Sequence, residues 1–266
     1  MYTIFDSHAH YDDDAFDTDR ESLLPRLHEN GICHIVNVGA SLQGCRDSVA
    51  LARQYPFLSA AVGVHPLHAH EIPADYLTEL EGMLGDPEVV AVGEIGLDYH
   101  YKDSAPRDVQ KEVFEAQLEL AARHNLPVII HDREAHGDTM EILRKYRPQG
   151  VVHCFSGSAE MAREVVSLGM YIGLGGVVTF KNARAAVEVA ASIPLSSLLL
   201  ETDAPYLAPE PHRGKRCDSS MIAYVADRIA QIRTDAAGVR ITPEDICQTA
   251  RQNAERLFGL TGRKKD

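Results

Sequence analysis

The sequence predicts an α/β fold, namely a (β/α)8 barrel. Eight short and almost continuously apolar runs alternate with longer segments of helical periodicity along the chain. Runs such as Val89–Val92 are apolar at successive positions, which is typical of parallel strands buried on both faces. The 266 residues also match the roughly 250 that one barrel needs. Because no linker or low-complexity segment interrupts the pattern, we expect one domain spanning residues 1–266.

The expected elements follow one another in strict alternation. The strands are Thr3–His10, His34–Ala40, Leu58–His65, Val89–Tyr99, Pro127–Asp132, Val151–Ser156, Tyr171–Val178 and Leu198–Asp203. The helices are Asp19–Asn30, Ser41–Gln54, Ala74–Leu84, Arg107–His124, Gly137–Tyr146, Ala159–Leu168, Ala183–Ala191, Ser219–Arg233 and Pro243–Phe258. Within Arg107–His124, Val113, Phe114 and Leu118 share one apolar stripe. Thr242 as N-cap and Pro243 at the first position begin the last helix.

Composition excludes several classes of protein. The formal net charge of −13 argues against coating of DNA by bulk electrostatics, because phosphate binding needs Lys and Arg. Five cysteines without a CxxC pair predict reduced thiols. The sequence shows no basic segment followed by an apolar stretch at its start and no apolar run of membrane-spanning length. We therefore expect a cytoplasmic protein without a membrane partner.

Titratable residues end six of the eight expected strands. These residues are His8, His10, His65, Glu94, His131, His153 and Asp203. In a parallel barrel such ends meet at one rim, where barrel active sites lie. His8 and His10 are two apart on a strand, so both imidazoles point the same way and could bind one divalent metal ion. Apart from His65, the set exceeds what one four-coordinate ion with an open position needs, and it suits two ions sharing a carboxylate bridge.

Further polar residues near this rim could contact a substrate or could serve only the surface and packing of the protein. His65, Arg133, Arg213, Lys215 and Arg216 are candidate substrate contacts, since Arg in particular matches phosphate oxygens. The alternatives are surface charge for the cations and packing before Pro66 for His65. Glu201 could orient a metal-bound histidine. The run Asp12–Asp14 is expected to be a solvated loop.

Taken together, the motifs resemble the TatD family of metal-dependent deoxyribonucleases. The matching stretches are DSHAHYD at 6–12, VGVHP at 62–66, GEIGLDYH at 93–100, PVIIHDREAH at 127–136, HCFSG at 153–157, LLLETDAPYLAP at 198–209, HRGKR at 212–216 and NAERLFGL at 253–260. They span nearly the whole chain in the right order. One departure follows Arg216, where family members commonly read Arg-Asn-Glu-Pro and this chain reads Cys-Asp-Ser-Ser at 217–220.

This resemblance implies an amidohydrolase-like barrel with two divalent ions, Mg²⁺ in function and Zn²⁺ or Mn²⁺ as alternatives. His8, His10, Glu94 and Asp203 would hold one ion. Glu94, His131 and His153 would hold the other, with Glu94 bridging. The implied activity is 3′-to-5′ exonucleolytic cleavage of DNA, and we expect single-stranded ends as the substrate and a monomeric enzyme. For such a substrate, Tyr99 or Tyr206 could stack on a base, or both could pack at the rim. In the mechanism we expect, Asp203 is the general base and Glu94 the other catalytic residue. Two alternatives remain: hydrolysis of an ester or amide, such as an aminoacyl ester on tRNA, and a non-catalytic metal-binding protein.

Overall fold

The computed structural model describes residues 3–101 and 104–262. In this part of the chain, eight strands form one sheet in chain order, each parallel to its neighbours. The strands are β1 (Ile4–Ala9), β2 (Ile32–Val38), β3 (Leu58–Val62), β4 (Val89–Asp98), β5 (Val128–Arg133), β6 (Gly150–Val152), β7 (Tyr171–Leu174) and β8 (Leu198–Leu200). The expected (β/α)8 barrel is confirmed.

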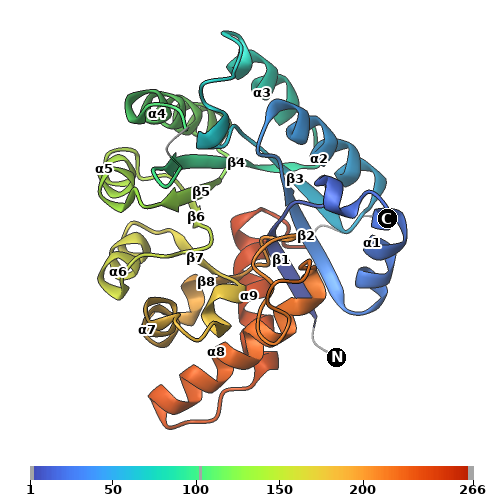
Figure 1. Ribbon diagram of the computed structural model, residues 1–266, viewed down its shortest axis with the longest axis vertical. Helices are drawn as coiled ribbons and strands as arrows, with labels where there is room; N and C mark the ends of the chain where they lie inside the picture. Colours follow the sequence, from blue (N-terminus) through green and yellow to red (C-terminus); the bar gives the residue numbers. More distant parts are fainter. Residues whose placement is uncertain (1–2, 102–103, 263–266) are drawn as a thin grey trace.

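Helices connect the strands and surround them as an outer ring (Figure 1). The α-helices in the described residues are α1 (Arg20–Glu29), α2 (Leu42–Gln54), α3 (Tyr76–Leu84), α4 (Arg107–His124), α5 (His136–Tyr146), α6 (Ala159–Ser167), α7 (Arg184–Ser192), α8 (Ile222–Ala237) and α9 (Pro243–Leu257). Val113, Phe114 and Leu118 are buried on α4, as the apolar stripe predicts. Thr242 and Asp245 form a reciprocal capping box at the start of α9.

The first strand and the segment after the last strand close the barrel. Ala9 and Ala204 form an isolated parallel bridge. Around it, the His10 N–H donates to the Ala204 carbonyl at 2.7 Å, and the Asp203 N–H donates to the His8 carbonyl at 2.9 Å. The seam between the two ends of the sheet therefore runs through three of the predicted metal ligands.

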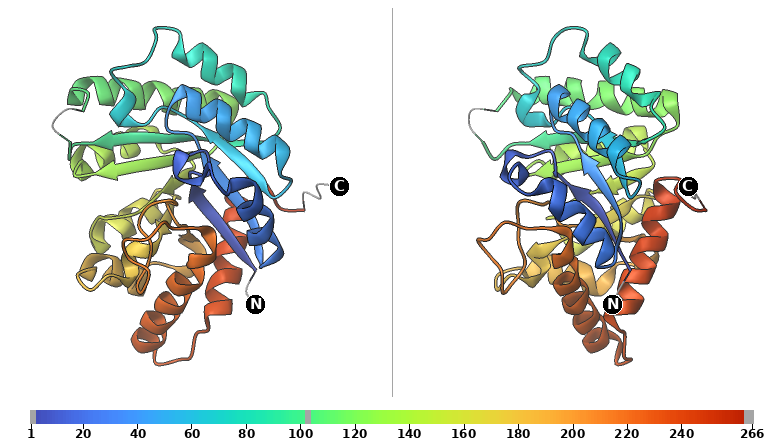
Figure 2. Two further views of the ribbon diagram at one scale, coloured as in Figure 1. Left: turned by 45° about the vertical axis from the view of Figure 1, so that its right-hand side comes forward. Right: turned by 90° about the vertical axis from the view of Figure 1, so that its right-hand side faces the viewer.

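Helix α9 supports the end of the barrel where β1 begins. Leu257 and Phe258 join a buried apolar cluster that includes residues of β1 to β6 and β8. The Phe258 ring stacks on Phe5 of β1 with centroids 6.2 Å apart. Asn253 of α9 donates two hydrogen bonds, to the carbonyls of Leu195 and Leu198 just before and in β8. Helices α8 and α9 lie side by side in both views of Figure 2.

Several strands are shorter than the sequence predicts. β6 ends at Val152 rather than Ser156, and β8 ends at Leu200 rather than Asp203. Beyond both ends the backbone turns, because Cys154 and Asp203 adopt left-handed conformations with φ of 43° and 61°. All five cysteines are free, as expected. No helix among the described residues is long and apolar enough to cross a membrane.

Candidate metal centre

Four potential ligand atoms meet at the seam of the barrel. They are Nε2 of His8, Nε2 of His10, Oδ1 of Asp203 and Oε2 of Glu94. The two imidazole nitrogens lie 3.0 Å apart. Each lies 3.4–3.7 Å from both the Asp203 and the Glu94 oxygen. We call these four residues cluster A.

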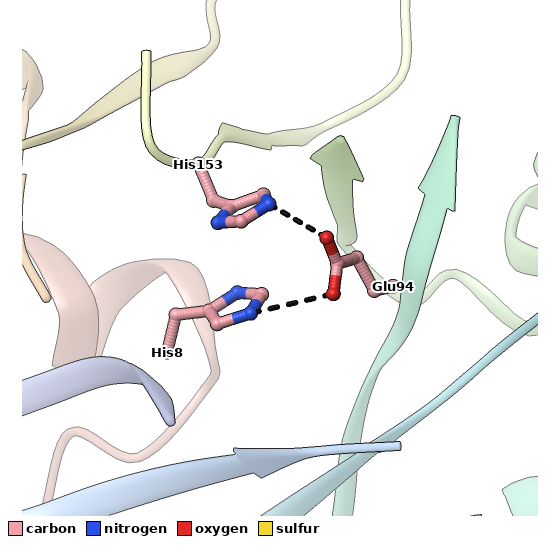
Figure 3. Close-up of side chains that lie close together, drawn as sticks. All are labelled: His8, Glu94 and His153. Carbon is pink, nitrogen blue, oxygen red and sulfur yellow. Dashed lines mark ion pairs between the residues drawn. The ribbon is translucent and has the colours of Figure 1, made fainter. Parts of the chain in front are cut away.

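A second set of atoms surrounds the other oxygen of Glu94. Oε1 lies 2.8 Å from Nδ1 of His131, 2.7 Å from Nε2 of His153 and 3.5 Å from Nε2 of His65. The facing nitrogens of His131 and His153 are 3.3 Å apart. We call Glu94, His131, His153 and His65 cluster B. Figure 3 shows His8 and His153 directed at the two different oxygens of the one carboxylate.

The spacing of cluster A fits a divalent cation. Ligand bonds of about 2.0–2.2 Å in a tetrahedral shell separate the ligand atoms by roughly 3.4 Å, and the separations in cluster A lie around that value. In the described part of the chain, three groups have ligand atoms within 4.8 Å of one another. Two share His8 (His8, Glu94 and His153; His8, His10 and Asp203), and the third is separate (His65, Asp98 and His131). Imidazole and carboxylate donors of this kind suit Zn²⁺ and Mn²⁺, and carboxylates also suit Mg²⁺.

Neighbouring groups fix which nitrogen two of the histidines present. Nδ1 of His10 lies 2.7 Å from the Val38 carbonyl, so it donates there and Nε2 faces cluster A. Nε2 of His131 lies 3.1 Å from Oδ2 of Asp98, and Nδ1 faces Glu94. Sequence reasoning placed Asp98 at a strand end but gave it no role. Its even spacing from Glu94 along β4 was the available signal.

Buried carboxylates and buried imidazoles shift one another's pKa values in this site. Burial disfavours a charge on His10, but hydrogen bonding to Asp203 and the charge of Glu94 raise its pKa to about 10. Burial likewise opposes the charge of His131, yet Asp98 and Glu94 raise its pKa to about 9. Burial and the neighbouring His153 lower the pKa of His8 to about 4. Without cations, protons on His10 and His131 would therefore offset the negative charges of the site.

Glu201 lies directly behind His153. Its Oε1 accepts a hydrogen bond from the Cys154 N–H and lies 3.8 Å from Nδ1 of His153. Gly173 of β7 makes room for this carboxylate, because a Cβ built on Gly173 would overlap Oε2 of Glu201. Burial raises the pKa of Glu201 to about 8, although the charge of His153 opposes this shift. The sequence analysis expected Glu201 to orient a histidine, and in the structure Glu201 lies just after the end of β8, facing His153.

A buried network of hydrogen bonds links β1 to the segment 217–220, which departs from the family pattern. Asp6 accepts hydrogen bonds from the hydroxyls of Thr202 at 2.6 Å and Ser219 at 2.7 Å. The Tyr11 hydroxyl lies 2.8 Å from that of Ser219. Ser219 belongs to the segment that departs from the family pattern, so this segment is tied to β1 by its own side chains.

The predicted substrate contacts have different surroundings. His65 is buried beside cluster B. Arg133 lies over the exposed ring of Tyr101, 5.0 Å from its centroid, and donates to the Tyr101 hydroxyl. Lys215 is exposed.

The remaining basic residues separate into two environments. Arg216 forms two hydrogen bonds with Asp19 and one with the Ala15 carbonyl, so most of its donors serve the fold. Arg213 instead stacks on Phe180, 3.9 Å from the ring centroid.

The acidic run and the rim tyrosines are more ordered than expected. Asp12 is partly buried and accepts a hydrogen bond from Asn37, so the expectation of a solvated loop was wrong for this residue. Asp13 accepts a hydrogen bond from the hydroxyl of Tyr206, whose ring lies 6.5 Å from His10 and is 54% exposed. Tyr99 donates to Asp138 and packs against the core.

A barrel whose rim gathers these imidazoles and carboxylates is typical of metal-dependent hydrolases. The family described as TatD related DNase matches residues 5–259. The chain is 41% identical to an uncharacterized metal-dependent hydrolase of Bacillus subtilis, YabD, over 97% of this chain and 99% of that one. It is 33% identical to the 3′-5′ ssDNA/RNA exonuclease TatD of Citrobacter rodentium, over 97% and 98%.

Among solved structures, the TatD homologue YJJV of Escherichia coli K12 is similar, with a TM-score of 0.89 and 34% identity. The match covers 97% of this chain and 98% of that one. The chain therefore belongs to the TatD family and is a metal-dependent hydrolase.

Proposed function

We propose that this protein is a two-metal nuclease that removes nucleotides from single-stranded ends of DNA in the 3′-to-5′ direction. The observation that carries the proposal is the position of Glu94, whose two carboxylate oxygens face two separate groups of imidazoles. The name of the Citrobacter relative supports the nucleic-acid substrate and adds RNA to the substrates that need testing. We further propose that the enzyme acts as a cytoplasmic monomer.

The proposed ligands divide as the two clusters do. His8, His10, Asp203 and one oxygen of Glu94 would hold one ion, and the other oxygen with His131 and His153 would hold the second. Divalent ions in such sites lower the pKa of bound water and neutralise charge on a phosphate. Either Mg²⁺ or Mn²⁺ would serve, and the imidazole-rich ligand set also accepts Zn²⁺.

The chain's own groups have separate tasks. Burial raises the pKa of Asp203, but the His10 hydrogen bond and nearby imidazoles more than offset it, so the carboxylate is ionised at neutral pH. Asp203 can therefore orient water and accept its proton. Burial and the neighbouring His131 lower the pKa of His65 to about 3, so it faces the site as a neutral imidazole. Nδ1 of His65 accepts a hydrogen bond from the Leu67 N–H, so the one proton of the neutral ring is on Nε2, which faces Glu94 and the site. This Nε2–H could donate to a phosphate oxygen.

The test is cleavage of 5′-labelled single-stranded DNA by metal-stripped protein after addition of Mg²⁺, Mn²⁺ or Zn²⁺. Wild type should shorten the strand from its 3′ end only with metal, and Asp203→Asn should lose at least about 100-fold in kcat because one general-base contribution is removed. Asp235→Asn, an exposed aspartate of α8, is the matched control and should cleave normally. Absence of cleavage from protein that holds two ions would refute the proposal and direct the search to RNA, aminoacyl esters and amides.

A further inference from the structure

A pocket lies between the loop that follows β7 and the loop that leads to α8. It has a volume of about 450 Å³ and is lined by Val177, Phe180, Lys181, Asn182, Ala183, Glu210 and Arg213. The two loops are joined by a hydrogen bond from the Glu210 N–H to the Thr179 hydroxyl at 2.9 Å. Both follow the C-terminal ends of strands, the ends at which the proposed metal ligands also lie. The volume lies within the range of about 300–1,000 Å³ that is usual for ligand pockets.

The charges lining this pocket favour an anion. Lys181 and Arg213 are exposed cations, and no ion pair within 4 Å joins either of them to an acid among residues 3–101 and 104–262. The neighbouring Arg184 and Arg216, in contrast, are paired with Glu188 and Asp19. Glu210 contributes one opposing carboxylate, so the lining retains a net positive charge. Cations without acidic partners are notable in a chain whose net charge is −13.

Arg213 is also preorganised. Its guanidinium lies 3.9 Å from the centroid of the Phe180 ring. Stacking restricts the side chain while leaving the N–H groups at the edge of the guanidinium available, and that fork of donors matches two phosphate oxygens. Ala183, at the N-cap of α7, supplies no side-chain cap to the first-turn N–H groups of that helix, which adds to the attraction of an anion.

The loop that carries Arg213 starts at the metal centre. Asp203 of cluster A is followed by Tyr206, whose exposed ring lies against His10, and then by Glu210 and Arg213 at the pocket. One loop therefore joins cluster A to the pocket, and a strand whose terminal phosphodiester lies at cluster A and which follows this loop would bring a phosphate further from its end to the pocket. Tyr206 offers an aromatic surface for a base on the same loop.

We propose that the Lys181–Arg213 pocket binds an internal phosphate of the substrate strand, away from the scissile bond. This inference rests on the proposed nuclease function and extends it, since it assigns a substrate subsite outside the metal centre. It requires that longer strands be better substrates than dinucleotides, because only the longer ones reach both sites.

The experiment compares oligothymidylates of two and eight nucleotides with the metal-loaded enzyme. In Lys181→Ala/Arg213→Ala the KM for the octamer should rise about tenfold or more, with kcat changed less than about twofold, because binding remote from the scissile bond is lost. The ratio of kcat/KM for octamer to dimer should fall by the same factor. Arg184→Ala removes a neighbouring exposed cation that is already paired, so it is the matched control and should keep the wild-type ratio.

Binding gives a readout that does not need turnover. In an Asp203→Asn background, the logarithm of octamer affinity is plotted against the logarithm of salt concentration. The slope of this plot should become shallower by roughly 0.7 when both cations are removed, because one phosphate contact on a single strand is lost. An unchanged length ratio and salt slope, with wild-type cleavage intact, would overturn the subsite and leave the nuclease function standing. If wild type neither cleaves nor binds either oligothymidylate, the nuclease function and the subsite fail together.

Discussion

Oδ2 of Asp98 lies 3.1 Å from Nε2 of His131, on the side of the imidazole ring opposite Glu94. Asp98 is itself held in place, because its Oδ1 accepts the His100 N–H at 2.9 Å and its own N–H donates to Gln110. A carboxylate in this position keeps the proton of His131 on Nε2 and presents the Nδ1 lone pair to cluster B.

The first prediction follows from this contact. Asp98→Ala should lower the affinity of cluster B for metal by about 10–100-fold, because the orientation and basicity of His131 are lost. Asp98→Asn keeps an acceptor for Nε2 and should lose less. Competition with a chromogenic chelator measures the affinity without relying on catalysis. Equal affinities for wild type and both variants would show that Asp98 does not support a ligand.

Gly173 tests the position of Glu201. Gly173→Ala would push Oε2 of Glu201 away, so we expect a lower kcat together with a loss of about 1–3 kcal/mol in stability from overpacking. Gly82→Ala on α3 is the control, since a Cβ there meets nothing within 4 Å. That control should be neutral or stabilise by about 0.5–1 kcal/mol. A Gly173→Ala enzyme with normal kcat would exclude a positioning role for Glu201.

Metal binding should release protons at neutral pH. The pKa values of about 10 for His10 and about 9 for His131 lie above the ordinary value of 6.5, so both are protonated at pH 7.5 without metal. Ligation needs the neutral imidazole, so at least two protons should leave on loading at pH 7.5, and affinity should rise with pH until about pH 9–10. Burial opposes the charge of His153 as well, but the Glu94 charge raises its pKa, so His153 would add to this release.

Titration calorimetry in buffers of different ionisation enthalpy counts these protons. The same shifts imply that the metal-free fold is favoured by protonation of the two imidazoles. That contribution is complete below about pH 6.5 and is lost as the pH rises through about 9–10. Calorimetric enthalpies independent of the buffer would contradict the assignment of protons to this site.

Asn253 provides a prediction about stability alone. Its amide donates to the carbonyls of Leu195 and Leu198 at 2.8 and 2.9 Å. Asn253→Leu would leave both carbonyls without this donor, and we expect a loss of about 2–4 kcal/mol in the free energy of unfolding. Gln231→Leu, an exposed change on α8, is the control for denaturant unfolding. A loss below about 0.5 kcal/mol would mean that other donors replace the amide.

The barrel, and the gathering of the six proposed ligand residues at one rim, could be predicted from the sequence because apolar runs mark buried strands and the C-terminal ends of parallel strands share one rim. The ends of β6 and β8 could not be read in the same way. Cys154 and Asp203 turn the chain with positive φ, and a pattern of apolar residues does not report backbone turns.

The basic loop near residue 213 shows a second limit of sequence reasoning. Arg213 and Arg216 are three residues apart and chemically identical, yet one stacks on Phe180 and the other pairs with Asp19. Asp19 is 197 positions away in the chain, so only the fold brings it to Arg216. Asp98 was similarly passed over because its partner, His131, lies on a different strand.

An ion bound by cluster A would join the first and last strands of the barrel. His8 and His10 belong to or directly follow β1, whereas Asp203 follows β8. In the part of the chain that the structure describes, the Ala9–Ala204 bridge and a small set of hydrogen bonds join these two ends. Such an ion would cross-link these strands, much as a disulfide links distant parts of a chain. Opening of the ring between β1 and β8 should then slow when the ion is bound, so chelation would expose this seam to hydrogen exchange before the rest of the sheet.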